Sequence, residues 1–142
     1  MRRFAAFASI ALGALASGGC QLELLRENPL GCRGDERSMV RETLYFGASI
    51  PGGGIVDDAA WQQFESDAIT PAFPRGYTVA EANGHWRGND GRSEAERSRV
   101  ATIIHVDSAH DAQALRAIAT SYAARFHQES VLRERSAVCA QF

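Results

Sequence analysis

The segment Met39-Val40-Arg41-Glu42-Thr43-Leu44-Tyr45-Phe46-Gly47-Ala48 decides the fold of this chain. Within it, apolar Val40, Leu44 and Phe46 lie on one face and polar or amphipathic side chains lie on the other. Successive side chains of a β-strand point to opposite faces, so this period of two predicts a strand with one buried face. The neighbouring elements must therefore supply a cover for that face.

Five further elements are expected after this strand. Asp57 and Ser108 are expected N-caps, because their side-chain oxygens can accept hydrogen bonds from the unpaired amides of a first helical turn. In chain order, the elements are a helix from Asp57 to about Thr70-Pro71, strands at 77–87 and 97–106, a helix from Ser108 to about Phe126, and a strand at 130–138. A turn at 88–91 and a charged connection at 92–96 separate the two middle strands. The order predicts an α+β, ferredoxin-like βαββαβ sandwich, with two helices on one face of a four-stranded antiparallel sheet.

The N-terminus has the layout of a secretory signal. Arg2 and Arg3 precede an apolar run at 4–15, and small residues follow it up to Cys20. The run is shorter than the roughly 20 residues that a membrane-spanning helix needs. Cleavage after Ala16 would leave a secreted or periplasmic soluble protein. Cleavage before Cys20, as in bacterial lipoprotein signals, would place lipid on its sulfur and anchor the protein to a membrane of the cell envelope.

The second cleavage site defines three segments of the chain. Residues 1–19 are the expected signal peptide, residues 20–38 a lipid-anchored flexible tether, and residues 39–142 the ferredoxin-like domain. We take this division as the expectation, with the membrane as a partner through the lipid on Cys20.

The three cysteines are an odd number for an oxidising compartment. Lipid on Cys20 would leave Cys32 and Cys139 as a pair. The first and last strands are neighbours in the expected fold, so a Cys32–Cys139 disulfide is geometrically reasonable and would stabilise the domain by about 4–5 kcal/mol in the chain-entropy model. Two free thiols are the alternative.

Composition excludes several functions. All fifteen basic residues are Arg, and with the two in the signal removed, thirteen face seventeen acidic residues for a net charge of −4. A mildly acidic domain does not favour nucleic acid, and without Lys neither a Schiff base nor a P-loop can form. His105 and His110 lack HExxH spacing and have no nearby cysteine pair, so neither a metal site nor a cofactor is expected.

Several stretches resemble one bacterial family. They are Arg41-Glu42-Thr43-Leu44-Tyr45-Phe46-Gly47, Thr70-Pro71-Ala72-Phe73-Pro74, Gly84-His85-Trp86-Arg87, Glu96-Arg97-Ser98-Arg99-Val100 and Arg125-Phe126-His127-Gln128-Glu129-Ser130-Val131-Leu132. In this order they are similar to the family known as domain of unknown function 3574, over residues 39–142. The resemblance implies small exported proteins, often lipoproteins. It implies no activity and no catalytic residues.

The sheet face without helices is the expected place for chemistry. If Leu44 and Phe46 point to the helices, regular alternation predicts an arginine-rich open face, with Trp86 and Leu132 turned inward. The residues expected on that face are Arg41, Thr43, Tyr45, Glu81, Asn83, His85, Arg87, Val131, Arg133 and Arg135. Three interpretations remain open: a solvated face, a self-associating face that forms a homodimer, and a small-molecule pocket.

The pocket interpretation assigns roles to individual side chains. His85 would transfer protons, because imidazole titrates near neutrality, and Glu81 would orient it, with Tyr45 a further candidate. Ligand carboxylates would be held by arginines, for which the candidates are Arg41, Arg87 and Arg133. The leading hypothesis is a module that binds a ligand or protein, or self-associates, through the open face. The alternative is a small cofactor-free enzyme of the dimeric α/β-barrel type that uses His85.

Overall fold

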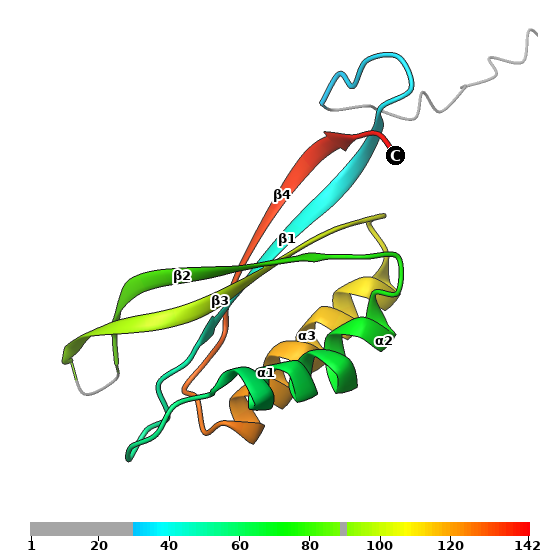
Figure 1. Cartoon of the computed structure of the whole chain (residues 1–142). Helices are drawn as coiled ribbons and strands as arrows, with labels where there is room; N and C mark the ends of the chain where they lie inside the picture. The colour runs from blue at the N-terminus through cyan, green and yellow to red at the C-terminus, as the bar shows by residue number, and fades with distance from the viewer. Residues whose placement is uncertain (1–29, 89–90) are drawn as a thin grey trace, which may run out of the picture.

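The computed structural model describes residues 30–88 and 91–142, and it has the architecture that the sequence predicts. Along the chain its elements are β1 (Arg37–Gly47), α1 (Asp58–Phe64), η1 (Glu65–Ile69, a π-helical segment), α2 (Thr70–Ala72), β2 (Thr78–Arg87), β3 (Ser93–His105), α3 (Ala109–Arg125) and β4 (Leu132–Ala140). The strands form one antiparallel sheet in the order β2-β3-β1-β4. The helices lie on one face of it (Figure 1). The fold is therefore ferredoxin-like.

The core lies between the sheet and the helices. Leu44 and Phe46 of β1 are fully buried. The Phe46 ring packs against the rings of Trp61, Phe64 and Tyr122, with centroids 5.2, 5.9 and 4.7 Å away. The alternation in β1 therefore points its apolar residues at the helices, as expected.

Capping residues fix both helix starts. The Asp57 carboxylate accepts a hydrogen bond from the Ala60 amide at 2.8 Å, and the Ser108 hydroxyl accepts one from the Asp111 amide at 3.0 Å. Both caps are where the sequence predicts them. The first helical region runs on through η1 and α2 and ends at Ala72, just after Pro71.

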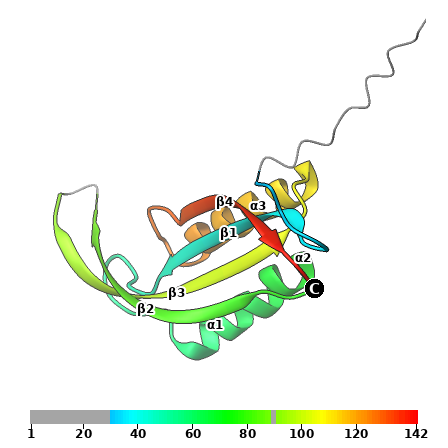
Figure 2. The same ribbon diagram turned by 90° about the horizontal axis from the view of Figure 1, so that it is seen from above.

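The hairpin of β2 and β3 is longer than predicted. β3 begins at Ser93, so the stretch 92–96, expected as a charged connection, belongs almost entirely to a strand. β3 pairs with β2 as far as Arg87 opposite Ser93. The hairpin curls beyond the helices (Figure 2), where nearly every β2 residue is exposed. With no buried face there, the sequence lacks the apolar alternation that marks a strand.

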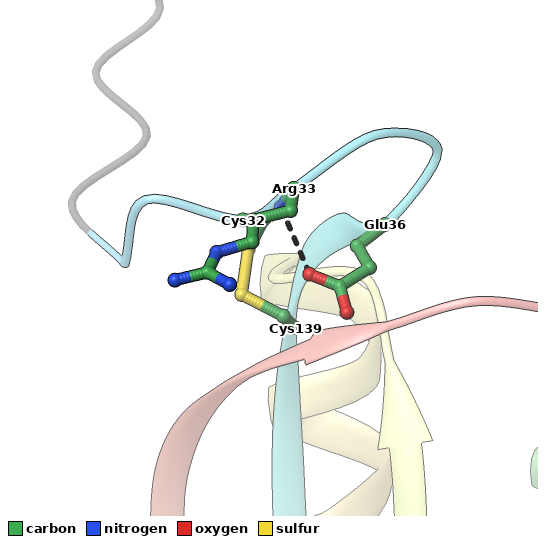
Figure 3. The surroundings of a disulfide bond; sticks show 4 residues. All are labelled: Cys32, Arg33, Glu36 and Cys139. Atoms are coloured by element: carbon green, nitrogen blue, oxygen red, sulfur yellow. Dashed lines mark hydrogen bonds between the residues drawn. A yellow bond between two sulfur atoms is a disulfide. The ribbon is translucent and has the colours of Figure 1, made fainter.

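A disulfide joins Cys32 to Cys139, with Cα atoms 5.4 Å apart. Figure 3 shows it beside the turn before β1, where the Arg33 amide donates a hydrogen bond to the Glu36 carboxylate at 2.9 Å. β1 begins at Arg37, so the segment expected as a tether up to residue 38 is attached to the sheet from Cys32 onward. The predicted signal peptide and Cys20 lie outside the described residues. Among those described, no helix has the length and apolar character needed to cross a membrane.

Candidate functional site

The register of β4 reverses the expected placement of its side chains. Arg133 lies opposite Leu44, and Leu132 lies opposite Tyr45. Leu44 is buried against the helices, so Arg133 is on the helix side and Leu132 is on the open face, with half of its surface (51%) exposed. The prediction that Arg133 and Arg135 lie on the open face is wrong. A shift of one residue in a strand moves every side chain to the other face.

The same correction applies to β2. Val79 lies opposite buried Ala101, so Glu81, Asn83, His85 and Arg87 share the helix-side face and Trp86 is on the open face. Trp86 is 43% exposed rather than turned inward.

The predicted pair of Glu81 and His85 is not formed. Glu81 instead makes an ion pair with Arg97 at 3.2 Å. Arg87 donates through its Nε to the Gly91 carbonyl at 2.9 Å and so braces the hairpin turn. These contacts give Glu81 and Arg87 local structural partners on the hairpin.

Arg133 and Arg135 surround a buried carboxylate on the helix side. The Glu42 side chain is only 4% exposed, and its oxygens lie 3.1 Å from Arg133 Nη2 and 3.6 Å from Arg135 Nε. Arg135 also contacts Asp107 at 2.6 Å. A buried charge requires such partners, because desolvation strongly disfavours an unpaired one. These arginines therefore stabilise Glu42 rather than face an open site.

The three predicted residues of β1, Arg41, Thr43 and Tyr45, do lie on the open face. Arg41 is exposed there and forms no ion pair within the described part of the chain. The Tyr45 hydroxyl donates to the Glu134 carboxylate at 3.0 Å. This hydrogen bond holds the pKa of Tyr45 above its usual value, because ionising the phenol would lose the bond and place two negative charges together.

A cleft of about 680 Å³ lies at the hairpin end of the open face. Three segments enclose it: the glycine-containing loop 49–54, the hairpin around its turn, and the connection 128–130 between α3 and β4. Tyr45, Trp86 and Leu132 provide its aromatic and apolar lining. His85 also borders the cleft, although the register places it on the opposite face from Trp86.

The cleft is rich in carboxylates. Among the described residues, Glu94, Glu96 and Glu129 line it, against one arginine, Arg92. Glu96 is held in place through the hydrogen bond that its Oε1 accepts from the Ser49 amide at 3.1 Å. Gly47 makes room for this carboxylate, since a Cβ atom at that position would come within 2.3 Å of Glu96 Oε1. Glu94 and Glu96 could not be found as site residues from the sequence, because they were expected in a solvated connection.

Other titratable groups cluster away from the cleft, at the start of α3. Burial raises the pKa of Asp111, but hydrogen bonds from His110 and Ser108 and the charge of His105 outweigh it and hold that pKa below its usual value. His105 is buried, and its Nε2 has no hydrogen-bond partner among the described residues. Among those residues, one group of three potential metal ligands comes together, namely Cys32, Glu36 and Cys139, and its two sulfurs are joined in the disulfide.

The fold and the cleft define a small ferredoxin-like domain with an open sheet face. The chain belongs to the family described as "Protein of unknown function (DUF3574)", whose profile matches residues 41–142. This confirms the resemblance found in the sequence. No curated protein matches the chain.

Solved structures share the fold at low sequence identity. A phage SAM lyase in complex with S-methyl-5'-thioadenosine is 16% identical, with a TM-score of 0.55, over 77% of this chain and 93% of that chain. The phage SAM lyase in its apo state is 17% identical, with a TM-score of 0.51, over 74% and 92%. CutA from Synechococcus elongatus, complexed with a Bis-Tris molecule, is 12% identical, with a TM-score of 0.42, over 74% and 83%.

Proposed function

We propose that the domain binds a small organic cation with a flat ring in the cleft of the open face. The observation that carries this proposal is the meeting of Trp86 and Tyr45 with the carboxylates Glu94 and Glu96 in one cleft of about 680 Å³. That volume falls within the range of about 300–1,000 Å³ that is usual for small-molecule sites.

The composition of the cleft favours a cation over an anion. Three carboxylates against one guanidinium give the lining a negative balance. An indole ring attracts a cation over its face, with about 0.5–1 kcal/mol at an exposed site and more when water is excluded. The glycine loop 49–54 is unsuited to phosphate, because Asp57 and Asp58 follow it closely.

The phage SAM lyase suggests the probes, although its likeness to this chain is in fold alone. S-Adenosylmethionine carries a positive sulfonium, and S-methyl-5'-thioadenosine is the neutral thioether with the same adenosine group. S-Adenosylmethionine also carries an amino-acid chain that the thioether lacks, so a difference in affinity reports the cation together with that chain. A variant without the Glu94 carboxylate then isolates the contribution of the charge. This comparison requires no assumption about a reaction.

Isothermal titration of the full chain with both compounds tests the proposal. We expect the sulfonium to bind at least five-fold more tightly than the thioether, since about 1 kcal/mol separates them. Trp86→Ala should weaken both, and Glu94→Gln should remove most of the preference for the cation. Glu81→Gln is the matched control, because Glu81 lies on the other face beside Arg97. Absence of binding by both compounds, or unchanged binding in Trp86→Ala, would refute the proposed site for this ligand class.

We further propose that the protein is exported and held at the cell envelope by lipid on Cys20, with residues 1–19 removed and the segment from Cys20 serving as the tether. The disulfide supports export, because such bonds persist in oxidising compartments. Intact mass spectrometry of the mature protein should give a chain that begins at Cys20 and carries added lipid mass. A chain that begins at Ser17 without lipid would instead establish cleavage after Ala16. Cys20→Ser should move the protein from the membrane fraction to the soluble fraction.

A further inference from the structure

The open face of the sheet carries exposed apolar side chains among its polar ones, including one row without any charged residue. In one row across it lie Ala80, Val100, Tyr45 and Leu132, since Ala80 and Tyr45 both pair with Val100 and Leu132 pairs with Tyr45. The helices lie on the other face (Figure 1), and none of the described helices covers this one. A sheet face that is exposed to water normally carries polar side chains in the place of such a row.

Three large apolar side chains on this face are exposed along its whole length. Trp86 near the hairpin turn is 43% exposed, Leu132 in the middle 51%, and Ile104 toward the far end of β3 38%. A single exposed apolar residue needs no explanation, whereas several on one face mark an interaction surface.

The face has the size of a protein interface. β1 has 11 residues. At about 3.3 Å per residue and about 4.8 Å per strand, a four-stranded face of this length measures about 36 by 19 Å, or about 700 Å². A stable complex buries about 800 Å² on each partner. The hairpin beyond the helices (Figure 2) extends this face, because Trp86 and Glu94 near its turn lie on the same side of the sheet as Val100.

Two charged side chains on the face, Arg41 and Glu134, indicate which partner covers it. Arg41 of β1 pairs with Ser136 of β4, and Glu134 of β4 pairs with Thr43 of β1, so Arg41 and Glu134 lie diagonally in adjacent rows. Arg41 forms no ion pair within residues 30–88 and 91–142, and Glu134 contacts only the Tyr45 hydroxyl there. Because Arg41 and Glu134 carry opposite charges in adjacent rows, this part of the face is complementary to a copy of itself that is rotated about a two-fold axis.

We propose that a second copy of this chain covers the open face about a two-fold axis, with Arg41 of each copy opposite Glu134 of the other. Ile104 and Leu132 are buried in the contact. Tyr45, Trp86 and Leu132 line both the face and the cleft, so the partner copy forms a wall of the cleft. The contact itself goes beyond the proposed ligand and does not depend on it.

Sedimentation velocity of the full chain, with its disulfide intact, measures the association. We expect a dimer at micromolar concentration, and we expect Ile104→Arg to raise the dissociation constant at least tenfold. Ile104 is partly exposed, so the change need not disturb folding, and Ile104→Gln gives a milder second variant. Ile55→Arg is the control, because Ile55 is also an exposed isoleucine, 54% against 38% for Ile104, but lies in the loop before α1.

A charge exchange tests whether the partner is a second copy. Arg41→Glu and Glu134→Arg should each weaken the dimer, and the double variant should recover most of the association, because the two charges are simply exchanged across the axis. A single charge reversal that leaves the sedimenting species a dimer would overturn the proposed contact. A double variant that associates as weakly as the single variants would overturn it as well.

A wild-type chain that remains a monomer at all concentrations also overturns the proposal. The same monomer mixed with phosphatidylglycerol vesicles then tests the other occupant: co-sedimentation that Ile104→Arg abolishes would assign the face to a lipid surface. Titration of the Ile104→Arg monomer with the sulfonium probe separates the two proposals. Binding there with no dimer in the wild type would retain the ligand site and reject the interface.

Discussion

Glu42 shows how strongly one buried residue can depend on its partners. It lies on β1 among apolar neighbours, and among the residues that the structure describes its charge is compensated by Arg133 and Arg135 alone. Removing the charge leaves the partly buried Arg133 without its ion pair. Breaking a buried pair costs more than breaking an exposed one, because the remaining charge is left desolvated and uncompensated.

We therefore expect Glu42→Gln to lower the free energy of unfolding by about 2–3 kcal/mol. Urea unfolding followed by circular dichroism measures the loss. Glu81→Gln serves as the comparison, since Glu81 forms an exposed ion pair with Arg97 outside the proposed dimer contact, and it should change stability by less than about 1 kcal/mol. Equal effects of the two substitutions would contradict a special role for the buried carboxylate.

Asp111 connects stability to pH. Its pKa in the folded domain lies below its ordinary value, so its ionised form stabilises the fold. This contribution is complete above the unfolded pKa of about 4 and is lost as the pH falls through the lower folded pKa. At neutral pH the negative charge of Asp111 also interacts favourably with the positive, N-terminal end of the α3 dipole.

Asp111→Asn should therefore be less stable than the wild type at pH 7, by about 1 kcal/mol. The two proteins should converge as the pH falls below 4 toward the acid limit. Thermal unfolding at a series of pH values checks this expectation. A difference that stays constant over the whole series would show that the charge of Asp111 does not contribute.

At the level of elements, the sequence predicted the strand and helix order but not the facing of every strand. β1 was predictable because apolar Leu44 and Phe46 mark a single buried side. β2 and β4 were not, because the assumption that a large apolar side chain must point to the helices fails for Trp86 and Leu132. Both lie on the face that the helices leave open, so their hydrophobicity did not identify the helix side.

The cleft was unpredictable for a related reason. Glu94 and Glu96 reach it because the hairpin continues as a strand well past the helices. Backbone pairing and a few polar side-chain contacts hold that part of the hairpin, and neither produces the apolar alternation by which a strand is predicted from sequence. Tyr45 was predicted on the open face correctly, because it belongs to the strongly patterned β1.

The disulfide should contribute a large share of stability to the pairing of β1 with β4. It joins positions 107 residues apart in the sequence. In the chain-entropy model, closing a loop of this size contributes about 4.7 kcal/mol. We expect the Cys32→Ser/Cys139→Ser variant to lose up to about that amount, as measured by urea unfolding. Adding reductant should weaken the wild type and leave the double variant unchanged.

Across the whole molecule, the disulfide and the cleft occupy opposite ends of the sheet. The cleft is lined by Leu132, at the start of β4, and the disulfide holds Cys139, near its end. The seven intervening steps correspond to about 23 Å at about 3.3 Å per residue. Changes separated by more than about 10 Å, with no shared partner, usually act independently.

Ligand affinity should accordingly survive loss of the disulfide. The Cys32→Ser/Cys139→Ser variant, titrated at a temperature where it is fully folded, should bind the sulfonium probe within about two-fold of the wild type. A larger loss of affinity would indicate that the two ends of the sheet are coupled.

The position of the disulfide also determines how the domain carries a mechanical load. A pulling force on the chain before Cys32 is transmitted to β1 through the backbone. The disulfide transmits the same force to the end of β4. Without the bridge, the same pull would begin at the first residues of β1 and peel that strand away from its neighbours one hydrogen bond at a time. With the bridge, two adjacent strands share the tension, and the folded domain resists being drawn apart from its attached end.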